Sequence, residues 1–121
     1  MTTEGERFAE AIANRDRDAL TALFAEDVDF TALTPRRTWQ AGSPDEVVDI
    51  VFGNWFEESD HIESSSAAEG ESAADTRHVG YRFAITNPDG PHVVAQQAFY
   101  RTEGDAIAWM RIVCSGYRPR D

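Results

Sequence analysis

Apolar residues in the first quarter of the chain recur at spacings of three and four, which is the spacing of one buried helix face. Thr3 and Glu6 have the Thr-x-x-Glu spacing of a capping box, so we expect a first helix to begin there. Asp16 is a suitable N-cap for a second helix, which should end near residues 26–27. The apolar side of these helices is formed by Phe8, Ala11, Ile12, Ala19, Leu20, Leu23 and Phe24.

The strongest local signal is the start of a third helix. Ser43 is a good N-cap, Pro44 suits the first helical position, and Glu46 completes a capping box. The buried stripe that follows is formed by Val47, Ile50, Val51 and Trp55.

The remaining segments have the alternation and punctuation of strands. Residues 28–33 alternate loosely up to Pro35, and residues 36–42 form a loop or a short strand. In the turn at 87–90, Pro88 presets φ and Gly90 accepts a positive φ. Four further strands are expected at residues 61–69, 76–86, 92–101 and 106–117.

The order of these elements is helix, helix, strand, helix and four strands, which predicts an α+β fold. The three N-terminal helices should pack in a strongly curved, mixed or antiparallel sheet. Such a sheet forms a cone with one closed and one open end. We expect residues 1–121 to form a single domain and the tail from Arg118 to be solvated and unstructured.

The composition is strongly acidic. Eleven Lys and Arg against 22 Asp and Glu give a net charge of −11, which argues against nucleic acid or an anionic membrane as the main partner. All the basic residues are Arg, which fits a salt-adapted host or simply an acidic protein. A single cysteine, an acidic start and the lack of an apolar run of about 20 residues favour a cytoplasmic location.

Three segments of the chain resemble the nuclear transport factor 2-like superfamily, and its SnoaL-like branch is the most similar. They are ALTALFAEDV at 19–28, AGSPDEV at 41–47 and GDAIAWMR at 104–111. The resemblance covers nearly the whole chain and implies the cone fold, a cystatin-like α+β barrel. It leaves function open, because this scaffold carries isomerases, cyclases, dehydratases, epoxide hydrolases and non-catalytic domains.

Comparison with the ketosteroid isomerases of that superfamily argues against their chemistry here. The position of their general-base aspartate falls on Ala32, and their two pocket tyrosines fall on Phe8 and Phe24. Their protonated aspartate falls on Gln97. Proton abstraction beside a ketone needs a base within hydrogen-bond reach, and Ala32 offers only a methyl group.

The same comparison assigns the faces of the sheet. If the turn at 87–90 closes a hairpin, Ala84 lies opposite Val93, Arg82 opposite Ala95 and Gly80 opposite Gln97. Because Gln97 maps to a pocket position, Arg82, Ala95, Gln97 and Phe99 should line the cone. A shift of one residue would exchange the two faces.

The expected pocket is mostly apolar, with Arg82 and Gln97 as its polar points. Such a site suits a small, partly apolar molecule that carries a carbonyl or a carboxylate. The alternative is a filled core, with Arg82 extending to the rim. The expected pocket residues are Phe8, Phe24, Phe30, Trp55, Arg82, Gln97, Phe99, Met110, Ile112 and Cys114.

Candidates for catalysis are weak. His61 beside Asp60 could act in proton transfer, with Arg82 and Gln97 stabilising charge, but an exposed histidine is the simpler interpretation. Cys114 is more typical of a small buried residue than of a nucleophile. The spacing of His and Cys fits no metal site, and we expect neither metal nor cofactor.

The convex face should carry the aromatic residues Tyr81, Phe83, Tyr100 and Trp109, and an exposed apolar face usually marks an interface. We therefore expect a homodimer through this face. Three functions remain open: binding of a small apolar molecule, a cofactor-free lyase, cyclase or isomerase reaction, and a pure interaction module. A carboxylate or histidine within reach of Arg82 or Gln97 would favour the enzyme.

Overall fold

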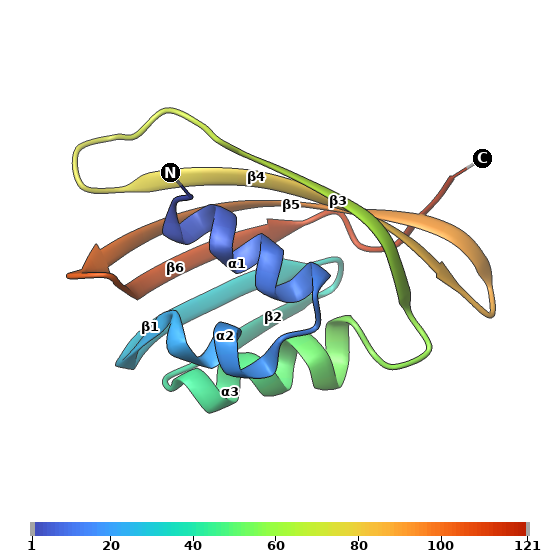
Figure 1. The fold of residues 1–121 in the computed structure, drawn as a ribbon, viewed down its shortest axis with the longest axis horizontal. Coiled ribbons are helices and arrows are strands. Elements are labelled where there is room, and N and C mark those ends of the chain that lie inside the picture. The colour runs from blue at the N-terminus through green and yellow to red at the C-terminus, as the bar shows by residue number, and fades with distance from the viewer. Residues whose placement is uncertain (1, 121) are drawn as a thin grey trace.

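Three helical segments lie on the inner side of a long curved sheet (Figure 1). The computed structural model describes residues 2–120, and the two ends of the chain lie at opposite ends of the sheet (Figure 1). The helices are α1 (Glu4–Ala13), α2 (Arg17–Ala22), α3 (Pro44–Ile50) and a π-helical turn, η1 (Val51–Trp55). The strands are β1 (Phe24–Thr34), β2 (Arg37–Ala41), β3 (His61–Glu69), β4 (Arg77–Asn87), β5 (Gly90–Glu103), β6 (Ala106–Cys114) and β7 (Arg118–Pro119).

All three expected N-caps are present. The Thr3 side chain accepts from the N–H of Glu6, and the reciprocal bond of the capping box is formed as well. Asp16 and Ser43 cap α2 and α3 by accepting from the N–H groups of Ala19 and Glu46, but the Glu46 carboxylate accepts from the N–H of Gly42 rather than that of Ser43. These bonds satisfy N–H groups that the first turn of a helix leaves without partners.

The second helix is shorter than the sequence predicts. It ends at Ala22, and strand β1 begins at Phe24. The carbonyl of Leu23 accepts from the N–H of Ile107, and Phe24 pairs with that residue in β6. Pairing with a distant strand therefore overrides the helical pattern of residues 24–27.

The predicted α+β fold and the order of its elements are confirmed. The sheet runs β2-β1-β6-β5-β4-β3 and is mixed, because β1 and β6 are parallel and the other neighbours are antiparallel. The expectation of an unstructured tail is wrong: β7 pairs with His92 and Val93 of β5, and Arg120 donates to the carbonyl of His92. No helix within residues 2–120 is long and apolar enough to cross a bilayer.

The hairpin register is confirmed, but its faces are the reverse of those predicted. Arg82 pairs with Ala95 and Gly80 with Gln97, as expected. Arg82 and Gln97 are nevertheless exposed, and so is Phe99, at 44%. The inward positions belong to the alternate set, in which Tyr81, Phe83, Val94, Gln96 and Tyr100 are buried.

The physical reason for this reversal is the alternation of β4. Its odd positions, from Val79 to Ile85, are all large and apolar, whereas its even positions include Gly80, Arg82 and Thr86. Burying the odd set removes the larger apolar area from water. The prediction assigns the pocket position to Gln97, whereas Gln96 occupies it. This error of one residue places every side chain of the hairpin on the wrong face of the sheet.

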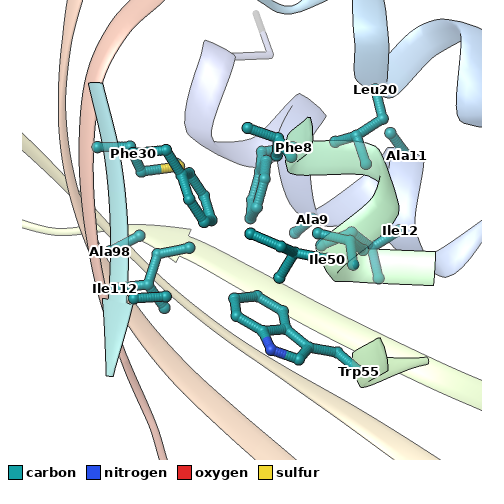
Figure 2. Close-up of a cluster of buried hydrophobic side chains, with 14 of the residues drawn as sticks. Phe8, Ala9, Ala11, Ile12, Leu20, Phe30, Ile50, Trp55, Ala98 and Ile112 are labelled. Atoms are coloured by element: carbon teal, nitrogen blue, oxygen red, sulfur yellow. The ribbon is translucent and has the colours of Figure 1, made fainter. Parts of the chain in front are cut away.

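Aromatic side chains fill the interior beneath the helices. Phe8 of α1 makes edge contacts with Phe24, at 5.9 Å between ring centroids, and with Tyr81, at 5.7 Å. In Figure 2, Phe8 and Phe30 lie on opposite sides of this interior, with Ile50, Ile112 and Trp55 closing it below. This part of the molecule is a packed core of buried apolar side chains.

Candidate ligand-binding site

A hollow lies at one end of the cone, where β1 turns into β2 and the chain leaves β6. We call it the mouth cavity, and its volume is about 530 Å³. Its floor is formed by the inward residues of β5, and its walls come from the end of η1 and the C-terminal tail. Its lining residues are Thr34, Pro35, Arg36, Asn54, Trp55, Phe56, Val94, Gln96, Cys114, Ser115, Gly116, Tyr117 and Arg118.

Gln96 is the most deeply buried polar group of this lining. It is 1% exposed, and its Oε1 accepts a hydrogen bond of 2.6 Å from the hydroxyl of Tyr81. Burial raises the pKa of Tyr81 well above its usual value, so the phenol stays protonated and donates. This bond directs the amide oxygen toward Tyr81, and within residues 2–120 the Nε2 group has no partner.

Trp55 supplies a second buried donor. Its side chain is 7% exposed, and its Nε1 group finds no hydrogen-bond partner in the described part of the chain. The nitrogen lies on the edge of the ring turned away from Phe8 and Phe30 (Figure 2). Trp39 packs edge-on against the same ring at 6.3 Å, which holds the indole in place.

The C-terminal tail forms one wall of the cavity, and a hydrogen bond to Asp60 attaches it. The hydroxyl of Tyr117 donates to Asp60 Oδ2 at 2.8 Å and also contacts the carbonyl of Trp55. Asp60 further accepts from Asn87 Nδ2 at 3.0 Å and from the N–H of Glu57 at 3.1 Å. Burial, then the hydrogen bond to Asp60, raises the pKa of Tyr117, so this residue stays neutral.

Two of the predicted pocket residues, Trp55 and Cys114, line the mouth cavity. The prediction of an inward position holds for five more, but these fill the packed core rather than a hollow. They are Phe8, Phe24, Phe30, Met110 and Ile112.

The remaining predicted pocket residues lie on the outer face. Arg82 and Gln97 line a shallow groove there with His78, whose Nε2 lies 2.7 Å from Gln97 Oε1. A histidine is thus within reach of Gln97, but outside the cone and open to water. His61 is exposed and lies elsewhere, at the start of β3, where it pairs with Thr86 of β4. The three catalytic candidates, His61, Arg82 and Gln97, therefore do not form one site.

The predicted interface residues need the same correction. Tyr81, Phe83 and Tyr100 are at most 2% exposed and cannot form an outer surface. Trp109 does lie on the outer face, between the guanidinium groups of Arg101 and Arg111 at 4.2 and 4.6 Å from its ring.

Sequence reasoning missed the polar groups of the mouth cavity. The alternation of β4 would have identified Gln96 as inward, since it pairs with Tyr81. No sequence signal singles out Tyr117, because its role depends on a tail that folds back over β5.

The arrangement can hold a small molecule and donate hydrogen bonds to it. The Gln96 amide has an unpaired Nε2 group in the described structure that can donate to an acceptor atom, and Trp55, Phe56, Val94 and Pro35 supply apolar contact. No lining residue is Asp, Glu or His, which are the usual proton-transfer groups.

Solved structures with the same fold support the architecture. No protein-family model and no curated protein matches the sequence. A proposed isomerase from Rhodopseudomonas palustris superposes with a TM-score of 0.75 at 14% identity, covering 96% of this chain and 92% of its own. A proposed isomerase from Bacillus subtilis gives 0.74 at 13% identity, covering 93% and 84%.

A third solved structure is named for the ketosteroid isomerase-like fold. It is a hypothetical protein with a ketosteroid isomerase-like fold from Catenulispora acidiphila, in complex with trimethylamine. Its TM-score is 0.69 at 18% identity, and the match covers 94% of this chain and 88% of that one. The chain therefore has a ketosteroid isomerase-like fold, which is the fold that the sequence resemblance implies.

Proposed function

We propose that this protein binds a small, partly apolar molecule in the mouth cavity. The observation that carries the proposal is a hollow of about 530 Å³ whose lining is largely apolar but includes the buried amide of Gln96, with its oxygen held by Tyr81. The unpaired side of the Gln96 amide could donate to an acceptor atom of a ligand, while the apolar lining contacts its body. A volume of this size is typical of small-molecule sites.

The chemistry of the lining favours binding over catalysis. The nearest buried carboxylate, Asp60, reaches the cavity only through Tyr117, and the raised pKa of that phenol opposes proton release near neutral pH. Binding of a small molecule also has a parallel in the same fold, since the Catenulispora acidiphila neighbour is described with trimethylamine.

The test is the binding of a neutral fluorescent probe, N-phenyl-1-naphthylamine, with and without a plug in the cavity. Val94→Phe adds volume to the cavity lining, and we expect it to weaken binding by about tenfold or more. Val113→Phe is the matched control, because Val113 is 56% exposed on the outer face. Cys114→Phe is a second plug, and thermal unfolding verifies that each variant is folded.

Loss of binding in both plugged variants but not in the control supports the proposal. Equal binding by all four proteins would show that the probe does not occupy the mouth cavity and would contradict it. Native mass spectrometry of the purified protein can then identify a ligand that is carried along.

The outer face favours a second, compatible function, the pairing of two copies. Leu33 and Val113 are partners across β1 and β6, at 49% and 56% exposed, and Phe99 lies nearby on β5. Adjacent exposed apolar residues of this size are unusual on a monomer's surface. We expect light scattering to give a dimer at micromolar concentration and Val113→Asp to convert it to a monomer; a native monomer would contradict this proposal.

A further inference from the structure

We propose that the ligand of the mouth cavity is an anion, an apolar organic acid whose charged group is held by Arg36 and Arg118. This inference rests on the proposed binding function and names the chemical class of the ligand. The apolar body of such a molecule would lie against Trp55 and Phe56, and its charged end would lie at the rim.

The charge of the lining is opposite to that of the molecule. The chain carries 22 acidic and 11 basic residues, yet the mouth cavity has two arginines and no Asp or Glu. The protein as a whole has a net charge of −11 and repels anions. A cavity whose only charged residues are positive attracts them locally.

The two arginines have no acidic partners in the described structure. Five other arginines form ion pairs within 4 Å, namely Arg7, Arg77, Arg101, Arg111 and Arg120. Arg118 is held at the rim by a bond of 3.2 Å from its Nε to the carbonyl of Ser115, which leaves its two terminal nitrogens available. Arg36 has no ion pair or side-chain hydrogen bond among residues 2–120.

The backbone brings both arginines to the lining of the mouth cavity. Arg36 occupies the two-residue turn between β1 and β2 with φ of +68°, a conformation that favours Gly or Asn. That turn packs on the tail: a Cβ added to Gly116 would lie 2.8 Å from Pro35. The segments that carry Arg36 and Arg118 therefore meet at the mouth cavity, although 82 positions separate the two residues (118 − 36).

The buried carboxylate of Asp60 is not part of the lining of the mouth cavity. Asp60 lies behind Tyr117, in the adjoining hollow with Glu57 and Asp89. Its carboxylate already accepts from Tyr117, Asn87 and the Glu57 N–H. A bidentate bond from arginine to a ligand carboxylate or sulfonate is thus the interaction left open at the rim.

Two probes with the same aromatic frame test the inference. 8-Anilino-1-naphthalenesulfonate carries a sulfonate, and N-phenyl-1-naphthylamine is neutral. In the double variant Arg36→Gln/Arg118→Gln, we expect binding of the anion to weaken by roughly ten- to a hundredfold, as for one or two charge-assisted bonds, and that of the neutral probe by less than about twofold. Arg82→Gln is the matched control, because Arg82 is also an exposed arginine without an ion pair in the described structure, on the outer face.

The outcomes separate this inference from the proposed function. If both probes weaken equally, or if the double variant changes neither, the arginines do not hold an anion and the inference is wrong, while cavity binding stands. If Arg82→Gln weakens the anion as much, the effect is one of net charge alone and the inference is also wrong. If the plugged variants leave the neutral probe unaffected, the proposed function itself fails.

Discussion

The two ends of the interior treat their buried polar groups differently. At the closed end, the Tyr100 hydroxyl accepts from the N–H of Gly5 at 3.1 Å and donates to Glu69, which also accepts from Thr3. At the mouth, Tyr81 satisfies only one side of the Gln96 amide, and Trp55 has an unpaired N–H in the described structure.

This difference indicates which end is built for stability and which for binding. Helix α1 approaches the sheet so closely that a Cβ on Gly5 would lie 2.8 Å from Val79 and from the Tyr100 ring. Burial and the bond to Glu69 raise the pKa of Tyr100 to about 12, consistent with a sealed and satisfied site. At the mouth, buried N–H groups lack hydrogen-bond partners in the described structure. Folded proteins usually satisfy such groups, and a bound molecule is one way to do so.

The largest expected effect is at the packed core. Phe8→Ala removes a ring that is fully buried between Phe24 and Tyr81, so we expect a loss of about 3–5 kcal/mol in the free energy of unfolding in urea. Phe99→Ala removes the same ring on the outer face and should cost less than about 1 kcal/mol. Similar losses at the two positions would contradict the assignment of the faces.

A smaller effect is expected at the floor of the mouth. Gln96→Leu leaves the Tyr81 hydroxyl buried without an acceptor, and we expect a loss of about 1–3 kcal/mol. Adding Tyr81→Phe removes the hydroxyl that lacks an acceptor. The double variant should therefore regain most of the lost free energy of unfolding. Simple additivity of the two changes in urea unfolding would show that the pair does not interact.

Much of the fold could be predicted because its signals are local. Caps at Thr3, Asp16 and Ser43 and the turn at 87–90 each depend on neighbouring residues, and each lies where expected. The strand register follows from the turn in the same way.

The site could not be predicted, because it depends on contacts between distant segments. The sequence assigns the inward side of β5 from a single position, the one aligned with a pocket residue of the ketosteroid isomerases. An error of one residue in that alignment places Gln97 in the pocket instead of Gln96. The tail appears featureless in sequence, yet Tyr117 reaches Asp60 and Arg118 pairs with β5. Such contacts follow from the three-dimensional path of the chain and leave no periodic pattern.

A third effect, of about 1 kcal/mol, is expected where the tail is attached. Tyr117→Phe keeps the ring and removes the bond to Asp60, which retains Asn87 and the Glu57 N–H as donors. Amide hydrogen exchange should increase at residues 115–120 and stay unchanged in α1. Uniform exchange in both regions would mean that the tail and the closed end open together, and that the two ends do not differ in local stability.

The smallest effect is at the closed end and depends on pH. Burial alone would raise the pKa of Glu4, but bonds to its own backbone N–H and to Arg77, at 2.7 Å, outweigh it and lower the pKa below the usual 4.5. A carboxyl whose pKa is lower in the folded state adds stability above its unfolded pKa, and this stability is lost as the pH falls through the folded value. The difference in unfolding free energy between the native chain and Glu4→Gln should therefore be largest near pH 7, at about 0.5–1 kcal/mol, and shrink below pH 4.5. Probe binding at the mouth should not change at any pH where both proteins are folded. A Glu4→Gln variant that weakens probe binding would show that the two ends are coupled, and the separation of stability from binding would then be wrong.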